Sequence, residues 1–139
     1  RQASDRSQFG LAEVKRNLIA GAGGLFRLPR AVGRNVAMEA ILTGDPLTAQ
    51  RAYELGLVNH VVAADVLIGK ALDVAGKVAS SAPIAVAKSR RIVLASAYED
   101  DETLKKMTDT AFGEVLKSED TKEGLTAFIE KRQPNWQGR

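Results

Sequence analysis

The chain has 139 residues, of which 45% are hydrophobic and 27% charged, and its formal net charge is +3. These values are typical of a globular domain with a modest core, and no run of about 18 apolar residues predicts a membrane span. The absence of cysteine excludes disulfides and thiol nucleophiles, and the single histidine, His60, excludes a histidine-rich metal site within one chain. We therefore expect no metal and no membrane partner.

The N-terminal segment gives further expectations. Its first residues, RQASDRSQ, lack the apolar stretch of a signal peptide, so we expect a cytoplasmic location. They also lack an initial methionine, which indicates a piece of a longer chain. Residues 1–34 hold seven Lys and Arg against Asp5 and Glu13. Basic segments suit phosphates, but with so small a net charge a solvated face is the stronger interpretation, and we expect no nucleic-acid partner.

The pattern predicts an α+β chain that is mostly helical. The chain is expected to be irregular or extended up to a glycine cluster, and residues 23–33 then form a short helix or a turn that Pro29 interrupts. Apolar residues at helical spacing predict a helix over residues 35–44, and Gly44 is its stop signal.

A second short helix is predicted over residues 45–56, with Thr48 as N-cap and Gly56 as C-cap. The β-branched residues of LVNHVV, residues 57–62, then predict a short strand in which His60 has a structural or surface role.

The rest of the chain is predicted to be helical. Pro83 suits the first turn of a helix that follows Ser80 or Ser81. The acidic run at residues 99–102 suits the N-terminus of another, because acids there complement the helix dipole. The apolar stripes that carry these predictions are Leu67, Ala71, Val74 and Val78; Ile84, Ala87 and Leu94; and Leu104, Met107, Ala111 and Val115.

A last helix is predicted from about Asp120 to Arg132, with Asp120 and Glu123 spaced as a capping box. Its apolar residues are expected to face inward; they are Leu125, Phe128 and Ile129. The last two helices carry more apolar surface than a small bundle needs, which indicates oligomerisation.

Glu13 is the first candidate for a catalytic group. It stands among four apolar residues between Phe9 and Val14. Apolar surroundings disfavour the charged form of a carboxyl, which is how a glutamate becomes a general acid near neutral pH. A salt bridge to Lys15 or Arg16, or plain exposure, is the structural alternative, and local context alone favours that alternative.

The glycine cluster GAGG, with Gly21, Gly23 and Gly24, precedes a predicted helix. Glycines let the backbone approach a ligand, and N–H groups at a helix N-terminus bind anions or orient water. The spacing matches neither nucleotide-binding glycine fingerprint, and a tight turn is the alternative.

Phe112, Phe128 and Lys131 are candidates in the last two helices. Both phenylalanines fall at apolar positions, where core packing is the ordinary role. Lys131 follows Phe128 by three residues on nearly the same helix face, where a phosphate site and a solvated lysine are the alternatives.

Three segments, read in order, carry a family resemblance: FGLAEVKRNLIAGAGGLFRLPRAVG, AMEAILTGDPLTAQRAYELGLVNHVV and SEDTKEGLTAFIEKRQPNW. They resemble the C-terminal half of the crotonase family, the enoyl-CoA hydratases and isomerases. The resemblance implies the end of a β/α spiral core over residues 1–62 and a helical trimerisation and CoA-contact region over residues 63–139. It also implies a homotrimer or a dimer of trimers.

The resemblance assigns roles by position. An FG-x-P-E segment of the family aligns with Phe9 to Glu13, so Glu13 is the implied catalytic acid, although Ala12 stands in place of the proline. Gly21, the first glycine of GAGG, is implied to offer its N–H to the attacking water.

Near the C-terminus, an aromatic residue and a lysine of one subunit are implied to reach the CoA bound by its neighbour. These are Phe112 and Lys131, with Phe128 packed close by. Coenzyme A is part of the acyl-CoA thioester substrate, so no separate cofactor is expected.

The family's other glutamate and its oxyanion hole belong to an N-terminal half that these residues do not contain. The expected function is thus the C-terminal part of an enoyl-CoA hydratase that acts on trans-2-enoyl-CoA in fatty-acid β-oxidation, with the 139-residue chain alone inactive. An isomerase or another acyl-CoA-processing member is one alternative. An inert oligomerisation fragment is a second, and RNA binding through the basic N-terminal third is the least favoured.

Overall fold

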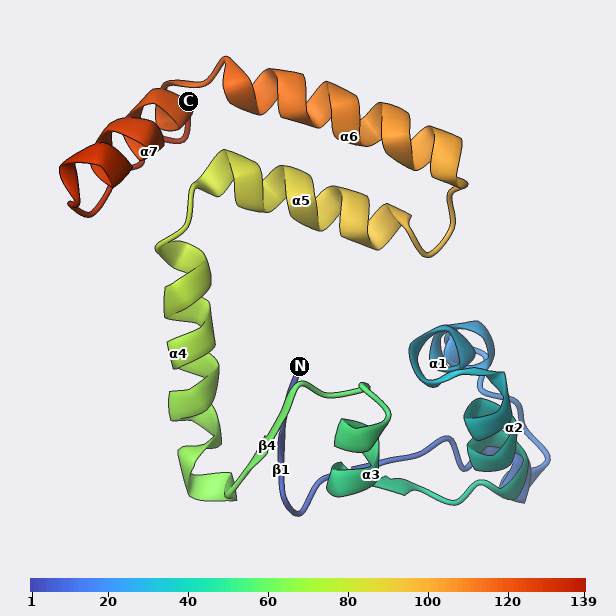
Figure 1. The fold of residues 1–139 in the computed structure, drawn as a ribbon. Coiled ribbons are helices and arrows are strands. Elements are labelled where there is room, and N and C mark those ends of the chain that lie inside the picture. The colour runs from blue at the N-terminus through green and yellow to red at the C-terminus, as the bar shows by residue number, and fades with distance from the viewer. The chain divides into compact units, whose positions relative to one another are not determined.

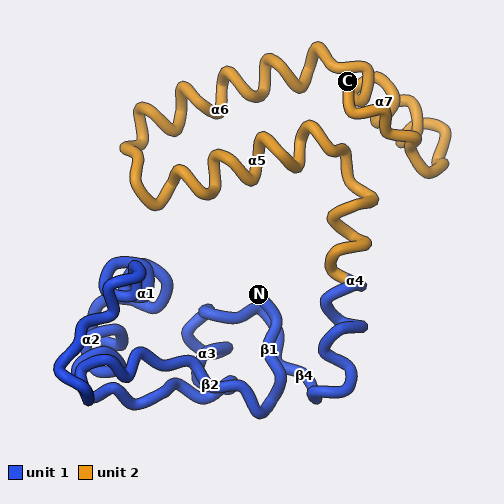
Figure 2. Tube along the Cα trace, turned by 180° about the vertical axis from the view of Figure 1, so that it is seen from behind, with its two compact units in different colours: residues 1–73 blue, residues 74–139 orange.

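Two units make up the computed structural model, which describes all of residues 1–139. The first is Arg1–Asp73 and the second is Val74–Arg139 (Figure 2). The chain is mostly helical with little sheet, as predicted. The predicted boundary between residues 62 and 63, which the family resemblance implied, stays a prediction.

The first unit contains two sheets of two short strands each. β1 (Gln2–Ser4) pairs in parallel with β4 (His60–Val62), and β2 (Gln8–Phe9) pairs antiparallel with β3 (Leu47–Thr48). The strand predicted within residues 57–62 is thus confirmed, and it is shorter than its β-branched stretch.

Helical segments fill the rest of the first unit (Figure 1). They are η1 (Glu13–Arg16), α1 (Gly24–Val32), α2 (Arg34–Thr43), α3 (Ala49–Glu54) and η2 (Ala64–Val66), where η marks a 3-10 turn.

Two predicted helix boundaries in this unit are confirmed. Gly44 ends α2 in the left-handed conformation, with φ of 67°, and its N–H donates to the carbonyl of Ala40 at 3.1 Å. Thr48 begins α3, because its Oγ1 accepts a hydrogen bond from the N–H of Arg51 at 3.1 Å. Both boundaries are set by local chemistry that the sequence displays.

The predicted interruption at Pro29 is wrong, because α1 runs through it without a break. A proline inside a helix removes the hydrogen bond from its own nitrogen to the carbonyl four positions earlier, and its ring crowds that carbonyl, but the other hydrogen bonds of the helix can remain. The bonds around it are intact, since Arg27 donates to the Gly23 carbonyl at 2.9 Å and Gly33 donates to the Pro29 carbonyl at 3.0 Å.

The core of the first unit is built from small side chains. Ala3 of β1 lies opposite Val61 of β4 and packs with Ala52 and Val58. Across the whole chain, alanines make up nearly all of the buried apolar residues, and no large side chain is fully buried. Large apolar side chains are instead exposed in both units.

The second unit is helical. α4 (Leu67–Ala79) leads into it and is followed by α5 (Pro83–Ala95), α6 (Asp101–Leu116) and α7 (Glu119–Glu130). α5 and α6 lie side by side (Figures 1 and 2). The predicted helices are therefore confirmed. The longest of them, α6, has 16 residues, and no helix of the chain has both the length and the apolar character that crossing a membrane requires.

The acidic run begins α6 as predicted. Asp100 is the N-cap, and its carboxylate accepts the N–H of Thr103 at 2.8 Å, a bond that lowers the pKa of Asp100. Pro83 occupies the first turn of α5, also as predicted. The hydroxyls of Ser80 and Ser81 both donate to the Lys77 carbonyl, so they bond to the last turn of α4 and do not cap α5.

The predicted capping box of α7 is wrong. Ser118 is the N-cap, and its hydroxyl accepts the N–H of Thr121 at 3.2 Å. Asp120 is instead buried, and its two carboxylate oxygens accept the N–H groups of Gln137 at 2.7 Å and Gly138 at 2.9 Å. The C-terminal tail, residues 133–139, is therefore bonded back to the start of α7.

The predicted inward face of α7 is wrong as well. Leu125, Phe128 and Ile129 are 62%, 83% and 78% exposed, whereas Ala127 is buried. Periodicity identifies the apolar face of a helix but not the surface that covers it, and within this chain nothing covers that face.

Candidate functional site

Glu13 is the first residue of η1, four residues after β2 ends at Phe9. The side chain is half-buried, and its Oε2 is shielded from solvent without any hydrogen-bond partner. The salt bridge to a neighbouring cation is not formed, because Lys15 pairs with Asp45 at 2.8 Å and Arg16 makes no ion pair. A shielded carboxylate oxygen without a partner is unusual in a folded chain, because burying a charged acceptor without a hydrogen bond is unfavourable.

In the structure, the segment that precedes Glu13 contacts the glycine cluster through Leu11 and Gly24. A side-chain carbon added to Gly24 would lie 2.8 Å from Leu11 Cδ1 and 2.8 Å from Ala20 Cβ. Only a glycine fits such a close approach. Gly24 thus allows the segment that precedes Glu13 to pack against the first turn of α1.

Gly21 lies before α1, whose N-cap is Gly23 with φ of 98°. The N–H of Gly21 donates to the carbonyl of Ile19 at 2.8 Å, two residues back, which is the tight-turn arrangement. The residue is exposed. The role implied for this N–H, holding the attacking water, stays a prediction.

A hollow of about 430 Å³ lies beside the same segment within the first unit. Phe9, Gly10 and Leu11 form one wall, and Gly24 and Leu28 of α1 contribute to another. Arg27 brings a positive charge to this mostly apolar hollow. Glu13 is not among its lining residues, so the carboxylate lies next to this hollow in sequence without facing it.

The other candidate residues lie in the second unit. Phe112, on α6, is 63% exposed and borders a hollow that is lined by residues of α5 and α6 only. Phe128 and Lys131 lie at the end of α7, and both are exposed. Core packing, the ordinary role for the two phenylalanines, is therefore not what this chain shows.

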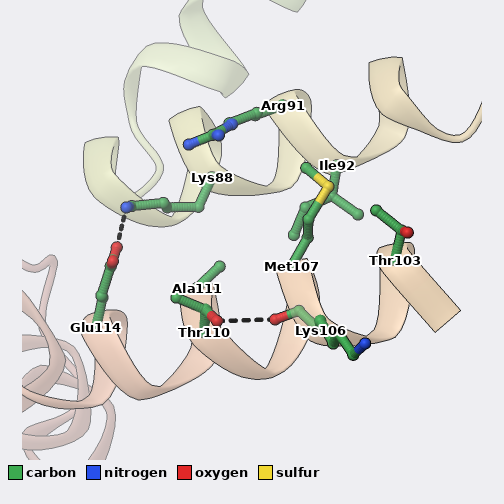
Figure 3. Close-up of a pocket in the computed structure, with 9 residues that line it drawn as sticks. All are labelled: Lys88, Arg91, Ile92, Thr103, Lys106, Met107, Thr110, Ala111 and Glu114. Atoms are coloured by element: carbon green, nitrogen blue, oxygen red, sulfur yellow. Dashed lines mark hydrogen bonds and ion pairs between the residues drawn. The ribbon is translucent and has the colours of Figure 1, made fainter. Parts of the chain in front are cut away.

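A further hollow of about 280 Å³ separates α5 from α6 (Figure 3). Its basic side chains are largely paired: Lys88 bonds to Glu114, which lowers the pKa of that glutamate, and Lys106 pairs with Glu102 at 2.7 Å. None of these four charged residues was predicted as a site residue, and their paired charges leave little net attraction for an anion.

No three metal-binding side chains converge anywhere in residues 1–139. Among the site residues predicted from the sequence, Glu13 is the titratable one in the first unit.

Comparison with known proteins decides the family. The family of enoyl-CoA hydratases and isomerases matches residues 1–139, the whole of the chain. The chain belongs to the enoyl-CoA hydratase/isomerase family.

Individual members of the family agree with this. A short-chain-enoyl-CoA hydratase from Clostridium acetobutylicum is 39% identical over 132 residues, which are 95% of this chain and 51% of that protein. The solved enoyl-CoA hydratase of Bacillus anthracis superposes on this chain with a TM-score of 0.96 at 40% sequence identity, and the match covers 100% of this chain and 54% of the solved chain. The solved enoyl-CoA hydratase of Mycobacterium tuberculosis superposes with a TM-score of 0.94 at 41% sequence identity, and that match covers 99% of this chain and 55% of the solved chain.

The chain spans about half the length of the curated enoyl-CoA hydratases it matches. Family membership and a hydratase-like fold are therefore established for these residues. The expected placement in the C-terminal half, the oligomeric state and the cytoplasmic location stay predictions.

Proposed function

We propose that this chain is the C-terminal half of an enoyl-CoA hydratase, which adds water across the 2,3-double bond of a trans-2-enoyl-CoA in fatty-acid β-oxidation. Glu13 donates a proton to C2 of the substrate. A second carboxylate, supplied by the part of the protein outside these 139 residues, takes a proton from water, and the resulting hydroxide adds to C3. The N–H of Gly21 exchanges its bond to Ile19 for the oxygen of that water.

The observation that carries this proposal is the shielded, unpartnered Oε2 of Glu13. A carboxylate that is neither neutralised by a cation nor satisfied by hydrogen bonds is free to exchange a proton with a bound substrate. Its position in the segment Phe9 to Glu13, within a member of the hydratase family, supports the acid role.

The exposed aromatic and basic side chains of the second unit support contacts between subunits. Phe112, Phe128 and Lys131 are proposed to contact the CoA portion of a substrate bound by a neighbouring copy in a trimer or a dimer of trimers. The high exposure of Phe128, 83%, favours such a contact, because a large apolar side chain gains stability when a partner covers it.

The 139-residue chain alone is proposed to be inactive. Hydration requires two carboxylates and donors to the thioester oxygen, and removing a single oxyanion donor slows other enzymes by about a hundredfold or more. Turnover of crotonyl-CoA by the isolated chain would refute this part of the proposal.

The test of the main proposal is Glu13→Gln in the full-length protein. Glutamine preserves the shape of the side chain and removes its transferable proton, so we expect the rate of crotonyl-CoA hydration to fall by about a hundredfold or more. Glu39→Gln, at an exposed glutamate of α2, is the matched control and should leave the rate unchanged. A near-normal rate for Glu13→Gln would remove Glu13 from the mechanism.

An isomerase is the second candidate function. It is favoured by one observation: these residues offer a single candidate carboxylate, which is sufficient to move a proton from one carbon to another, and the family includes isomerases. A panel of trans-2- and cis-3-enoyl-CoA substrates would separate the two activities.

A further inference from the structure

Lys131 has a backbone conformation that non-glycine residues seldom adopt. It follows α7 with φ of 55° and ψ of 38°, in the left-handed region, where a side chain costs about 1–2 kcal/mol. Its N–H donates to the Phe128 carbonyl at 3.3 Å, and that of Arg132 donates to the Ala127 carbonyl at 3.0 Å. This is a Schellman-type helix end, at which glycine is the usual residue.

Glu123, two turns earlier on α7, bonds to the chain that follows Lys131. Its carboxylate accepts Arg132 Nη1 at 2.6 Å on Oε1 and Arg132 Nη2 at 3.0 Å on Oε2, a bidentate pair. Oε1 also accepts the N–H of Asn135 at 2.7 Å. The side chain of Glu123 is only 23% exposed, so these bonds are partly shielded from water. The backbone is thereby held on the C-terminal side of Lys131.

The same contacts distribute the charges at the end of α7. Arg132 is neutralised by Glu123 and, through its Nε at 2.6 Å, by Glu130. Lys131, between Glu130 and Arg132 in sequence, has no carboxylate partner. Of the two adjacent cations, only the lysine therefore presents an uncompensated charge to an incoming anion.

We infer that Glu123 is a positioning residue for substrate binding: by holding Arg132 and Asn135, it fixes the direction of the Lys131 side chain and keeps Glu130 from neutralising it. The ligand group is a phosphate of the CoA portion of the substrate, which a lysine binds as a point charge. This inference rests on the proposed function, specifically on the contact between Lys131 and CoA.

The test compares two substrates in the full-length protein: crotonyl-CoA and crotonyl-pantetheine, which lacks the phosphates and the nucleotide. Lys131→Ala should raise the KM for crotonyl-CoA about tenfold and leave kcat and the KM for crotonyl-pantetheine unchanged. Glu123→Gln should raise the KM for crotonyl-CoA about threefold to tenfold, an effect in the lower part of the range of coupling within one hydrogen-bond network. It should leave the KM for crotonyl-pantetheine unchanged.

The double variant decides whether Glu123 acts through Lys131 or only stabilises the end of α7. In the Lys131→Ala background, Glu123→Gln should have no further effect on the KM for crotonyl-CoA. Glu119→Gln is the matched control, because Glu119 also joins α7 to the tail, through Arg139 at 2.8 Å, and should not change either KM. Should Glu123→Gln fold poorly, Arg132→Lys keeps the charge but loses the bidentate fork and should show the same pattern.

Three results would overturn the inference. The first is that Glu123→Gln and Arg132→Lys both leave the KM for crotonyl-CoA unchanged. The second is that either substitution still raises this KM in the Lys131→Ala background, and the third is that either raises the KM for crotonyl-pantetheine equally. If Lys131→Ala itself leaves the KM for crotonyl-CoA unchanged, the assignment of Lys131 in the proposed function fails and this inference falls with it. The hydration chemistry of Glu13 is tested separately by Glu13→Gln.

Discussion

Asp120→Asn should weaken the contact between residues 137 and 138 of the C-terminal tail and the start of α7. Asp120 is only 3% exposed, and its oxygens accept the N–H groups of Gln137 and Gly138 at 2.7 and 2.9 Å. Hydrogen bonds to a charged acceptor contribute about 1.5–3 kcal/mol each. Asparagine retains one acceptor oxygen and turns an amide N–H₂ towards the other donor, so at least one bond is lost. We expect the free energy required to open this contact to fall by about 2–3 kcal/mol, which is a factor of about 30 to 150 in the opening equilibrium.

Hydrogen–deuterium exchange of the Gln137 and Gly138 N–H groups measures this opening. Asp120 protects both groups in the closed form, whereas Arg132 and Asn135 are held separately by Glu123. When reclosing is fast, the exchange rate follows the population of the open form. Glu119→Gln is the control: its ion pair with Arg139 is solvent-exposed, and such pairs contribute about 0–1 kcal/mol, so exchange of these two groups should rise less than about fivefold. Equal exchange rates for Asp120→Asn and the unmodified protein would refute the reasoning.

Two further predictions concern stability. Gly44→Ala should reduce the free energy of unfolding by about 1–2 kcal/mol, because Gly44 has φ of 67° and the new methyl group would lie 3.0 Å from Lys15 Cε; an unchanged urea midpoint would contradict this. Hydrogen bonds from Arg132 and from the Asn135 N–H lower the pKa of Glu123 from 4.5 to about 2. A depressed folded-state pKa contributes stability above the unfolded value and loses it as pH falls. Unfolding measured between pH 4.5 and 2 should therefore show a shallower acid decline in Glu123→Gln, and identical declines would rule out this contribution.

The features that sequence reasoning placed correctly are local ones. Gly44 and Thr48 were identifiable because a left-handed helix end and a side-chain N-cap each need a particular residue type at one position. The helices α4 to α6 followed from apolar spacing alone. For the candidate site, the segment around Glu13 and the glycine cluster could be identified, but their contact through Leu11 and Gly24 is a packing event that no spacing rule gives.

The features that were missed depend on contacts distant in sequence. Asp120 and Glu123 have the spacing of a capping box, but both carboxylates are occupied by the chain that follows α7, and nothing in the sequence before the tail indicates this. The pairing of β1 with β4 joins residues nearly sixty positions apart, and the short β1 has no pattern of its own. The apolar face of α7 could be identified, but not that Leu125 would be exposed within this chain.

The central claim is that Glu13 supplies the proton for hydration, and a single-turnover measurement in deuterated water tests it most directly. With full-length protein in excess over crotonyl-CoA, the unmodified enzyme should form a 3-hydroxyacyl product that carries deuterium at C2. Glu13→Gln should bind the substrate with an unchanged Kd and form that product about a hundredfold or more slowly. Full-rate product formation by Glu13→Gln, or a loss confined to substrate binding, would contradict the role of Glu13 as the acid.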